Sequence, residues 1–164
     1  MEKIIKQLPS KAAAERQSHK AFFKKLRKKP PKDLDYTMAQ LHDETFAKIN
    51  CLDCANCCKT TSPLFTDRDV TRISKFLKLK PRQFTDQYLK TDEDGDLVLK
   101  SSPCPFLFED NTCMIYEVRP KACAEYPHTN RKKFHQISNI TLENTGICPA
   151  AFEIVEKLKV KLSN

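Results

Sequence analysis

The sequence predicts a mainly α-helical fold with a small β-hairpin (α+β), built as a single compact domain behind a basic N-terminal helical arm. Three observations support this prediction. Apolar residues recur at helical spacing through much of the 164-residue chain, and a short acidic turn separates two apolar runs near its middle. The composition, with 40% apolar and 30% charged residues, is that of a globular chain.

Residues 1–32 are predicted to form the arm. A helix is expected over residues 10–28, with a short apolar patch at 22–26, and the prolines at 30–31 end it because proline cannot continue the hydrogen-bond ladder. The arm carries eleven Lys or Arg against two Glu, whereas the rest of the chain has eighteen basic and nineteen acidic residues. Such a run of charge is typical of a solvated helix face, but it also fits an arm that contacts nucleic acid or an acidic protein.

Residues 33–164 are predicted to form the domain, which begins with three helices. The first, over residues 36–49, leads directly into a cysteine-rich segment. The TDRD sequence at 66–69 is a capping box that opens a second helix, and Pro81 suits the first turn of a third. The side chains expected on the inner faces of these helices are Met38, Leu41, Thr45, Ile49, Val70, Ile73, Phe76, Leu77, Phe84, Tyr88 and Leu89.

The hairpin is expected at DEDGD, residues 92–96, which the run LVL follows. The acidic residues do not predict a calcium loop, because an EF-hand has glycine at its sixth position and a distal glutamate. Two further short strands are expected within residues 104–116, which would bring Cys104 near Cys113.

Two more helical segments are predicted to place cysteines. A helical turn begins at Pro120 and carries Cys123. The last helix begins at Pro149, so that Cys148 lies at its N-terminus, where the helix dipole favours the thiolate. The inward side chains of this last helix are predicted to be Phe152, Val155, Leu158 and Leu162.

The eight cysteines include four within CLDCANCC at residues 51–58. Disulfide bonds would require an oxidising compartment, whereas the N-terminal residues lack the apolar core of a secretory signal, so a cytoplasmic, reducing location is expected. Isolated buried cysteines are common, but four in eight positions with few apolar neighbours do not form a core pattern. A Cys-x-x-Cys step lets two thiolates bind one ion, so the spacing favours a metal at the centre of the domain.

The same spacing is compatible with two metals. Structural zinc takes four sulfur or nitrogen ligands, so eight cysteines could fill two closed sites. The run Cys51-x-x-Cys54-x-x-Cys57 is also the start of the bacterial ferredoxin motif, although Thr61 stands where that motif has its next cysteine. The expected cofactor is therefore zinc or iron, the latter as ions or a 4Fe-4S cluster, in one multinuclear site or in two.

The ordered cysteine pattern resembles the YkgJ-type cysteine-cluster family, a zinc- or iron-chelating domain family named for its CxxCxxCC motif. The resemblance covers about residues 46–150 and rests on CLDCANCC at 51–58, CPFL at 104–107, CMIYEVRPKAC at 113–123 with the following Tyr126-Pro127, and Cys148-Pro149. Ala124 and Ala150 depart from the family, which often has arginine and glycine there. The resemblance implies that the metal ligands are Cys51, Cys54, Cys57, Cys58, Cys104, Cys113, Cys123 and Cys148.

Two neighbouring side chains have alternative roles. Arg119 could neutralise the charge of the thiolates, or it could cap a turn through a carboxylate. His128 could replace a cysteine as a ligand, or it could be an incidental surface histidine.

The predicted function is that of a small cytosolic metal-binding protein. Flagellin lysine methylase shares this cysteine domain, so the resemblance also implies an alternative, an iron–sulfur-dependent enzyme or an accessory factor in protein modification. A further alternative is a zinc-stabilised module that binds nucleic acid or protein through the basic arm. Gly95 and Gly146 are the two glycines, so no phosphate-binding loop or dinucleotide fingerprint can be written. No apolar run approaches the ~18 residues of a membrane span.

Overall fold

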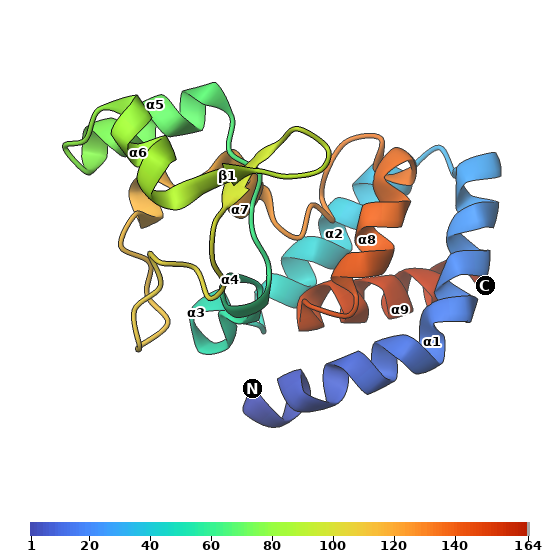
Figure 1. Ribbon diagram of the computed structural model, residues 1–164. Coiled ribbons are helices and arrows are strands. Elements are labelled where there is room, and N and C mark those ends of the chain that lie inside the picture. The colour runs from blue at the N-terminus through green and yellow to red at the C-terminus, as the bar shows by residue number, and fades with distance from the viewer. Residues whose placement is uncertain (164) are drawn as a thin grey trace. The chain divides into compact units, whose positions relative to one another are not determined.

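The computed structural model describes residues 1–163 (Figure 1), and 62% of the chain is helical, with one small antiparallel hairpin. The predicted fold class is therefore confirmed. The chain divides into two compact units: unit 1 contains residues 1–54 and 127–164, and unit 2 contains residues 55–126. Within residues 1–163, no helix has both the length and the apolar character that crossing a bilayer requires. The predicted boundary between an arm and a domain after Lys32 remains a prediction.

The regular secondary-structure elements of unit 1 are helices. Its elements are α1 (Glu2–Lys28), α2 (Leu34–Phe46), α3 (Cys51–Cys54), the 3-10 helix η2 (Phe134–Ile137), α8 (Ser138–Asn144) and α9 (Pro149–Ser163). Helix α9 packs against α2, and α1 packs against both α8 and α9 (Figure 1). These contacts bury a core that contains Phe23, Leu26, Leu34, Met38, Leu41, Phe134, Ile137, Leu142, Ile154, Val155 and Leu158.

Helix α1 begins at Glu2, earlier than the predicted start at residue 10, and continues through Pro9. Leu8 and Ala12 are buried together with Phe23 and Leu26, so the apolar face extends over most of the helix. Packing of this face offsets the hydrogen bond that proline removes from a helix interior. Packing of α1 against the rest of unit 1 therefore begins at Leu8, well before the apolar patch that the sequence predicted at residues 22–26.

Helix α9 confirms part of the predicted inner face. Val155 and Leu158 are fully buried, but Phe152 is only half-buried and Leu162 is 38% exposed. Ile154 and the small residues Ala150 and Ala151 take their places in the core. The buried face is therefore rotated about the helix axis relative to the predicted one and lies nearer the start of the helix.

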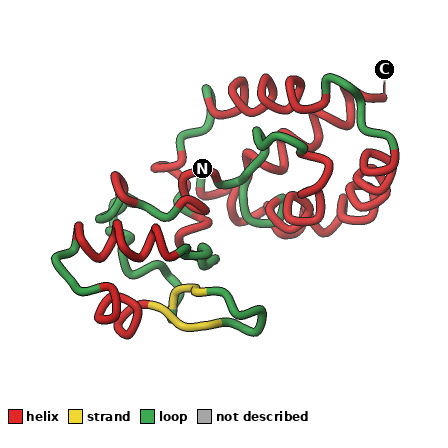
Figure 2. The backbone as a smooth tube through the Cα atoms, turned by 90° about the horizontal axis from the view of Figure 1, so that it is seen from above, coloured by secondary structure: helices red, strands yellow, loops and turns green. Residues whose placement is uncertain are grey.

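Unit 2 combines short helices with the hairpin. Its elements are α4 (Asn56–Thr60), α5 (Asp67–Phe76), α6 (Pro81–Tyr88), β1 (Leu89–Thr91), β2 (Leu97–Leu99), η1 (Tyr116–Val118) and α7 (Lys121–Glu125). Strands β1 and β2 pair antiparallel, with Leu89 opposite Leu99 (Figure 2). The predicted capping box at the start of α5 is present, because the Asp69 amide donates to Thr66 Oγ1 (3.2 Å) and the Thr66 amide donates to Asp69 Oδ2 (2.9 Å).

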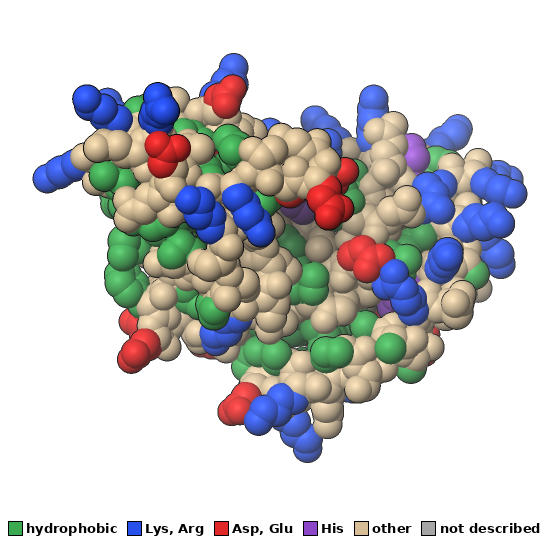
Figure 3. Space-filling model, viewed as in Figure 1, with side chains coloured by type: hydrophobic (Ala, Val, Ile, Leu, Met, Phe, Trp, Pro, Cys, Tyr) green, Lys and Arg blue, Asp and Glu red, His purple; other side chains and the backbone are tan. Residues whose placement is uncertain are grey.

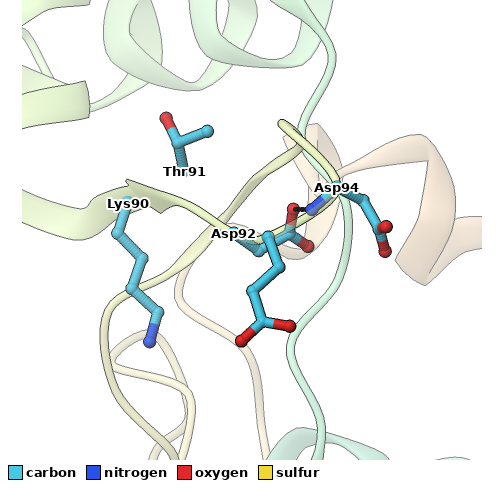
Figure 4. Close-up of a pocket in the computed structure, with 5 residues that line it drawn as sticks. Lys90, Thr91, Asp92 and Asp94 are labelled. Carbon is cyan, nitrogen blue, oxygen red and sulfur yellow. Dashed lines mark hydrogen bonds between the residues drawn. The ribbon is translucent and has the colours of Figure 1, made fainter.

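The acidic turn of the hairpin is a structural turn, as predicted. One carboxylate oxygen of Asp92 accepts hydrogen bonds from the backbone N–H groups of Asp94 (3.0 Å) and Asp96 (2.9 Å). Figure 4 shows Asp92 and Asp94 at a hollow that Lys90, Thr91 and Glu93 also line. Since the backbone of the turn occupies this oxygen of Asp92, local turn chemistry explains the carboxylate at this position.

Two expectations for unit 2 are corrected. Phe76 is 49% exposed, because the inner face of α5 is formed by Val70 and Ile73. Residues 104–116 form a single bridge between Leu107 and Cys113 instead of two strands. Asn111 adopts a left-handed conformation (φ 67°) in the tight turn between these two residues.

We predict that Phe84→Ala will destabilise unit 2 by about 3–5 kcal/mol, because Phe84 is fully buried and contacts the rings of Phe65, Tyr88 and Phe106. The matched control is Phe76→Ala on the neighbouring helix, where we expect a change of about 1 kcal/mol or less. Urea unfolding followed by circular dichroism measures both variants. Equal losses in the two would contradict the assignment of this core.

Candidate metal centre

Unit 1 contains three cysteines, whose sulfur atoms do not all lie within 4.8 Å of one another. Cys51 and Cys54 stand at the two ends of α3, and Cys148 directly precedes α9. Burial is the main cause that raises the pKa of Cys148, and Cys51 and Cys54 add a smaller effect, which places the three side chains in the same region of unit 1 although almost one hundred residues separate them in sequence. The grouping therefore joins the first half of the CLDCANCC run to the start of the last helix.

Local hydrogen bonds position these three cysteines. The Asn50 side chain accepts from the Leu52 amide (3.1 Å) at the start of α3. The Cys148 amide donates to the Asn144 carbonyl (2.8 Å), and the Asn144 side chain donates to the Pro127 carbonyl (3.3 Å). Asn144 thus links the turn that carries Cys148 to Pro127, the residue at which the chain returns to unit 1.

The expected thiolate at the N-terminus of α9 is opposed by burial. Burial is the largest influence and raises the pKa of Cys148 to about 11, whereas the amides of Ala151 and Ala150 act in the opposite direction. The helix N-terminus therefore contributes in the predicted sense, but desolvation outweighs it.

Unit 2 contains the other five cysteines. Cys57 and Cys58 belong to α4 and Cys123 to α7, whereas Cys104 and Cys113 lie in the loops between. The Cys104 amide donates to the Cys58 carbonyl (2.8 Å), which ties the loop to α4. Cys58 raises the pKa of Cys104, Cys113 and Cys123, and Cys123 is also influenced by Cys104 and Cys113. The backbone brings the Cys104 and Cys113 segments together, because the Leu107 amide donates to the Cys104 carbonyl (3.1 Å) and Leu107 forms a β-bridge with Cys113.

The thiols of unit 2 differ in acidity. A hydrogen bond from Cys57 lowers the pKa of Cys58 to about 7, against the opposing effect of burial. Burial followed by the neighbouring thiols raises the pKa of Cys104 to about 11 and that of Cys123 to about 12. A cation bound among these sulfurs would oppose the effects of burial and of the neighbouring thiols, because it stabilises the thiolate form and so lowers the pKa of each thiol.

Arg119 supplies positive charge to this group. Its guanidinium lies over the Tyr116 ring, 3.9 Å from the centroid, and Nη1 donates to the Tyr116 carbonyl (2.7 Å). The same charge lowers the pKa of Cys113 and Cys123, although burial has the larger effect on each. These contacts support charge neutralisation for Arg119, and its turn contact is with a carbonyl and not with a carboxylate.

Asp69 and Arg72 form a support for Cys123 that the sequence analysis missed. Asp69 is 1% exposed, and its Oδ1 accepts from Arg72 Nη2 (2.6 Å) and from the Lys121 amide (3.1 Å). Arg72 also donates to the carbonyls of Val118 (3.3 Å) and Arg119 (2.9 Å). The pair therefore joins α5 to the segment that opens α7. The Asp-x-x-Arg spacing inside the capping-box helix was the available signal.

His128 lies in unit 1, where it is half-buried with a left-handed backbone (φ 64°). Its participation in metal binding remains a prediction, as does the set of eight cysteine ligands.

A helical fold that gathers thiols into groups is typical of cysteine-rich metal-chelating domains. The chain belongs to the CxxCxxCC family, described as "Putative zinc- or iron-chelating domain", which matches residues 50–141. The family recognised from the cysteine pattern is thereby confirmed. The matched region contains seven of the eight cysteines and ends before Cys148, so it is shorter than the expected 46–150. No solved structure matches the chain.

We predict that Asp69→Asn will destabilise the protein by about 2–3 kcal/mol at pH 7, because it weakens charge-assisted hydrogen bonds to a buried carboxylate. Burial raises the pKa of Asp69, but the hydrogen bonds from Thr66, Arg72 and Lys121 outweigh it and lower the pKa overall. The contribution is therefore complete above the unfolded pKa of about 3.9 and is lost as the pH falls through the lower folded value.

The control for this variant is Asp67→Asn, an exposed change in the first turn of the same helix, which should cost less than about 1 kcal/mol. Thermal unfolding at pH 7 and at pH 3 measures both. A difference between wild type and Asp69→Asn that does not narrow on acidification would contradict the proposed role of the Asp69 carboxylate.

Proposed function

We propose that this protein binds zinc or iron through its eight cysteines, in two groups. The unit 2 group consists of Cys58, Cys104, Cys113 and Cys123, with Cys57 beside Cys58. The unit 1 group consists of Cys51, Cys54 and Cys148. The observations that support this proposal are the family match and the backbone contacts that join the Cys58, Cys104 and Cys113 segments. The Cys104 amide donates to the Cys58 carbonyl (2.8 Å), the Leu107 amide donates to the Cys104 carbonyl (3.1 Å), and Leu107 forms a β-bridge with Cys113.

The donor chemistry of the unit 2 group fits both candidate metals. Four thiolates satisfy a closed tetrahedral zinc site, and four thiolates also hold a 4Fe-4S cluster. A structural or electron-transfer centre is favoured for this group, because a closed set of ligands leaves no position for a substrate. The two metals differ in colour and in sulfide content, so composition distinguishes them.

The unit 1 group offers three thiols, one fewer than a closed site requires. A fourth ligand would therefore come from another side chain or from a bound molecule, as in metal sites that retain an open position. Because the unit 1 group has three thiols and the unit 2 group has four, metal bound at the two groups is expected to behave differently. Metal held by the unit 1 group should exchange and react with chelators more readily than metal held by four thiolates.

The thiol protons link metal binding to pH. A metal must displace the protons of Cys104, Cys123 and Cys148, whose pKa values are all raised mainly by burial. Binding should therefore release protons and weaken on acidification.

We predict that Cys123→Ser and Cys148→Ser will each remove one part of the bound metal and leave the other. The measurement is elemental analysis with acid-labile sulfide and a visible spectrum, on protein purified without oxygen. Colourless protein with zinc supports structural sites, whereas brown protein with iron and sulfide supports a cluster. Ala124→Ser is the control for a serine in α7, because it keeps every cysteine and should keep all metal.

The two variants also distinguish two separate metal sites from a single metal centre that both groups of cysteines share. If either substitution removed all metal, a single multinuclear centre would replace the two-group proposal. If wild type purified without metal and failed to take up zinc or iron, the proposed function itself would be wrong.

We further predict that Cys57→Ser will lower metal content and solubility together. Cys57 hydrogen-bonds to Cys58 and lowers its pKa, so the substitution alters the most acidic thiol of the group as well as one candidate ligand. Metal per chain and the soluble fraction after expression measure the effect. Unchanged metal content would remove Cys57 from the ligand set.

A further inference from the structure

Unit 1 carries a concentrated positive surface, which we call the α1 basic surface. It combines the C-terminal half of α1 and the residues that follow it with the loop that precedes η2. Its members are all exposed: Lys20, Lys24, Lys25, Arg27, Lys28, Lys29, Lys32, Arg131, Lys132 and Lys133. Figure 3 shows Lys and Arg side chains gathered over the C-terminal half of α1.

The loop at 131–133 is fixed beside α1 and is not a loose tail. The Asp35 carboxylate accepts from the amides of Lys133 (2.7 Å) and Phe134 (3.0 Å). The Phe134 ring packs against Phe23 of α1 with centroids 6.3 Å apart. These contacts unite two basic segments, one hundred residues apart in sequence, on one face of unit 1.

A second contact holds the following residues to the same helix. Arg27 Nη1 donates to the Ser138 hydroxyl (2.8 Å) and to the Asn139 side-chain oxygen (2.8 Å). Both partners are neutral, so the charge of Arg27 is oriented without being neutralised.

Two carboxylates lie at this surface and balance part of its charge, namely Asp33, next to Lys32 in sequence, and Asp35, which accepts from the Lys133 and Phe134 amides. Elsewhere in unit 1, Arg16 pairs with Glu143, and Lys159 bridges Glu15 and Glu156. Within residues 1–163, none of the ten members of the α1 basic surface forms an ion pair with a carboxylate. Many of the unit 1 cations that form no ion pair therefore belong to this surface.

The helix also arranges part of this charge in a row. Lys20, Lys24 and Lys28 follow each other at i, i+4 spacing on α1, which is uninterrupted from Glu2 to Lys28. Four residues advance a helix by about 6 Å, so the three ammonium groups are distributed along a length of about 12 Å. A repeating polyanion is the ligand that best matches such a row.

The burial of the apolar side chains in this region argues against a membrane, a protein or a single-stranded nucleic acid as the partner of this surface. Phe23, Leu26 and Phe134 are buried in the core, and Phe22 is half-buried, so no large apolar side chain within 20–32 or 131–135 is exposed. A membrane-bound helix inserts an apolar face, a protein interface has aromatic anchors, and a single-strand binder stacks bases on aromatic rings. The ten members of the α1 basic surface therefore offer phosphate contacts, and Tyr36, which is 67% exposed and follows Asp35, is an exposed aromatic side chain beside them in sequence.

We propose that the α1 basic surface binds the phosphate backbone of double-stranded nucleic acid without reading its sequence. Lysine and arginine contacts to phosphate position a protein on a duplex and carry no sequence information. The binding should therefore be strongly salt-dependent and nearly equal for duplexes of different sequence. This proposal does not depend on which metal the cysteines bind.

The test is fluorescence anisotropy of a labelled 20-base-pair DNA duplex with the full-length, metal-loaded protein, from 50 to 200 mM KCl. The informative variant is the triple substitution Lys20→Gln, Lys24→Gln and Lys28→Gln. We expect at least a tenfold weaker Kd at 50 mM KCl and a salt slope smaller by about 2 to 3, because up to three phosphate contacts are lost.

The control removes the same charge from unit 2, through Lys75→Gln, Lys78→Gln and Lys90→Gln, all of which are exposed. This variant should change the Kd less than twofold, and circular dichroism and metal content should match wild type in both triples. Equal loss in the two triples would overturn the proposal, since it would reflect net charge alone. No duplex binding by wild type at 50 mM KCl, or tighter binding to vesicles of phosphatidylserine and phosphatidylcholine, would also overturn it.

Discussion

The proposed convergence of the thiols of Cys58, Cys104, Cys113 and Cys123 on one metal is the constraint from which the rest of this account follows. Thiols brought together in a partly buried place cannot all ionise, because each thiolate raises the pKa of its neighbours and burial raises it further. Nothing about such a group favours folding by itself. A bound cation changes the balance, since it neutralises the thiolates and links separate segments.

This requirement accounts for the organisation of unit 2. Its hairpin and short helices bury a modest core, and much of the chain between Cys104 and Cys123 is loop or short helix. The Asp69–Arg72 pair orders the approach to Cys123 through backbone contacts, and Arg119 adds positive charge beside two thiols. Metal binding and folding are expected to be linked here, because the ligands come from segments that only the fold brings together.

The sequence predicted the features that depend on local chemistry. The capping box at Thr66, the hairpin turn at Asp92 and the helical turn that carries Cys123 each follow from the properties of a few adjacent residues, and all are present. The family was also evident, because the order and spacing of the cysteines are specific. Features that depend on distant contacts were not evident. The early start of α1, the exposure of Phe76 and the grouping of Cys148 with Cys51 and Cys54 are decided by packing, which a single sequence does not show.

The most direct measurement of the central claim is X-ray absorption spectroscopy, at the zinc and iron edges, of protein purified without oxygen. If cysteine thiols are the ligands, the nearest shell should be sulfur at about 2.3 Å, with an additional iron–iron distance if the metal is a cluster. A nearest shell dominated by nitrogen or oxygen at about 2.0–2.1 Å would contradict the account, because the metal would then be bound by imidazole or carboxylate groups instead of the gathered thiols.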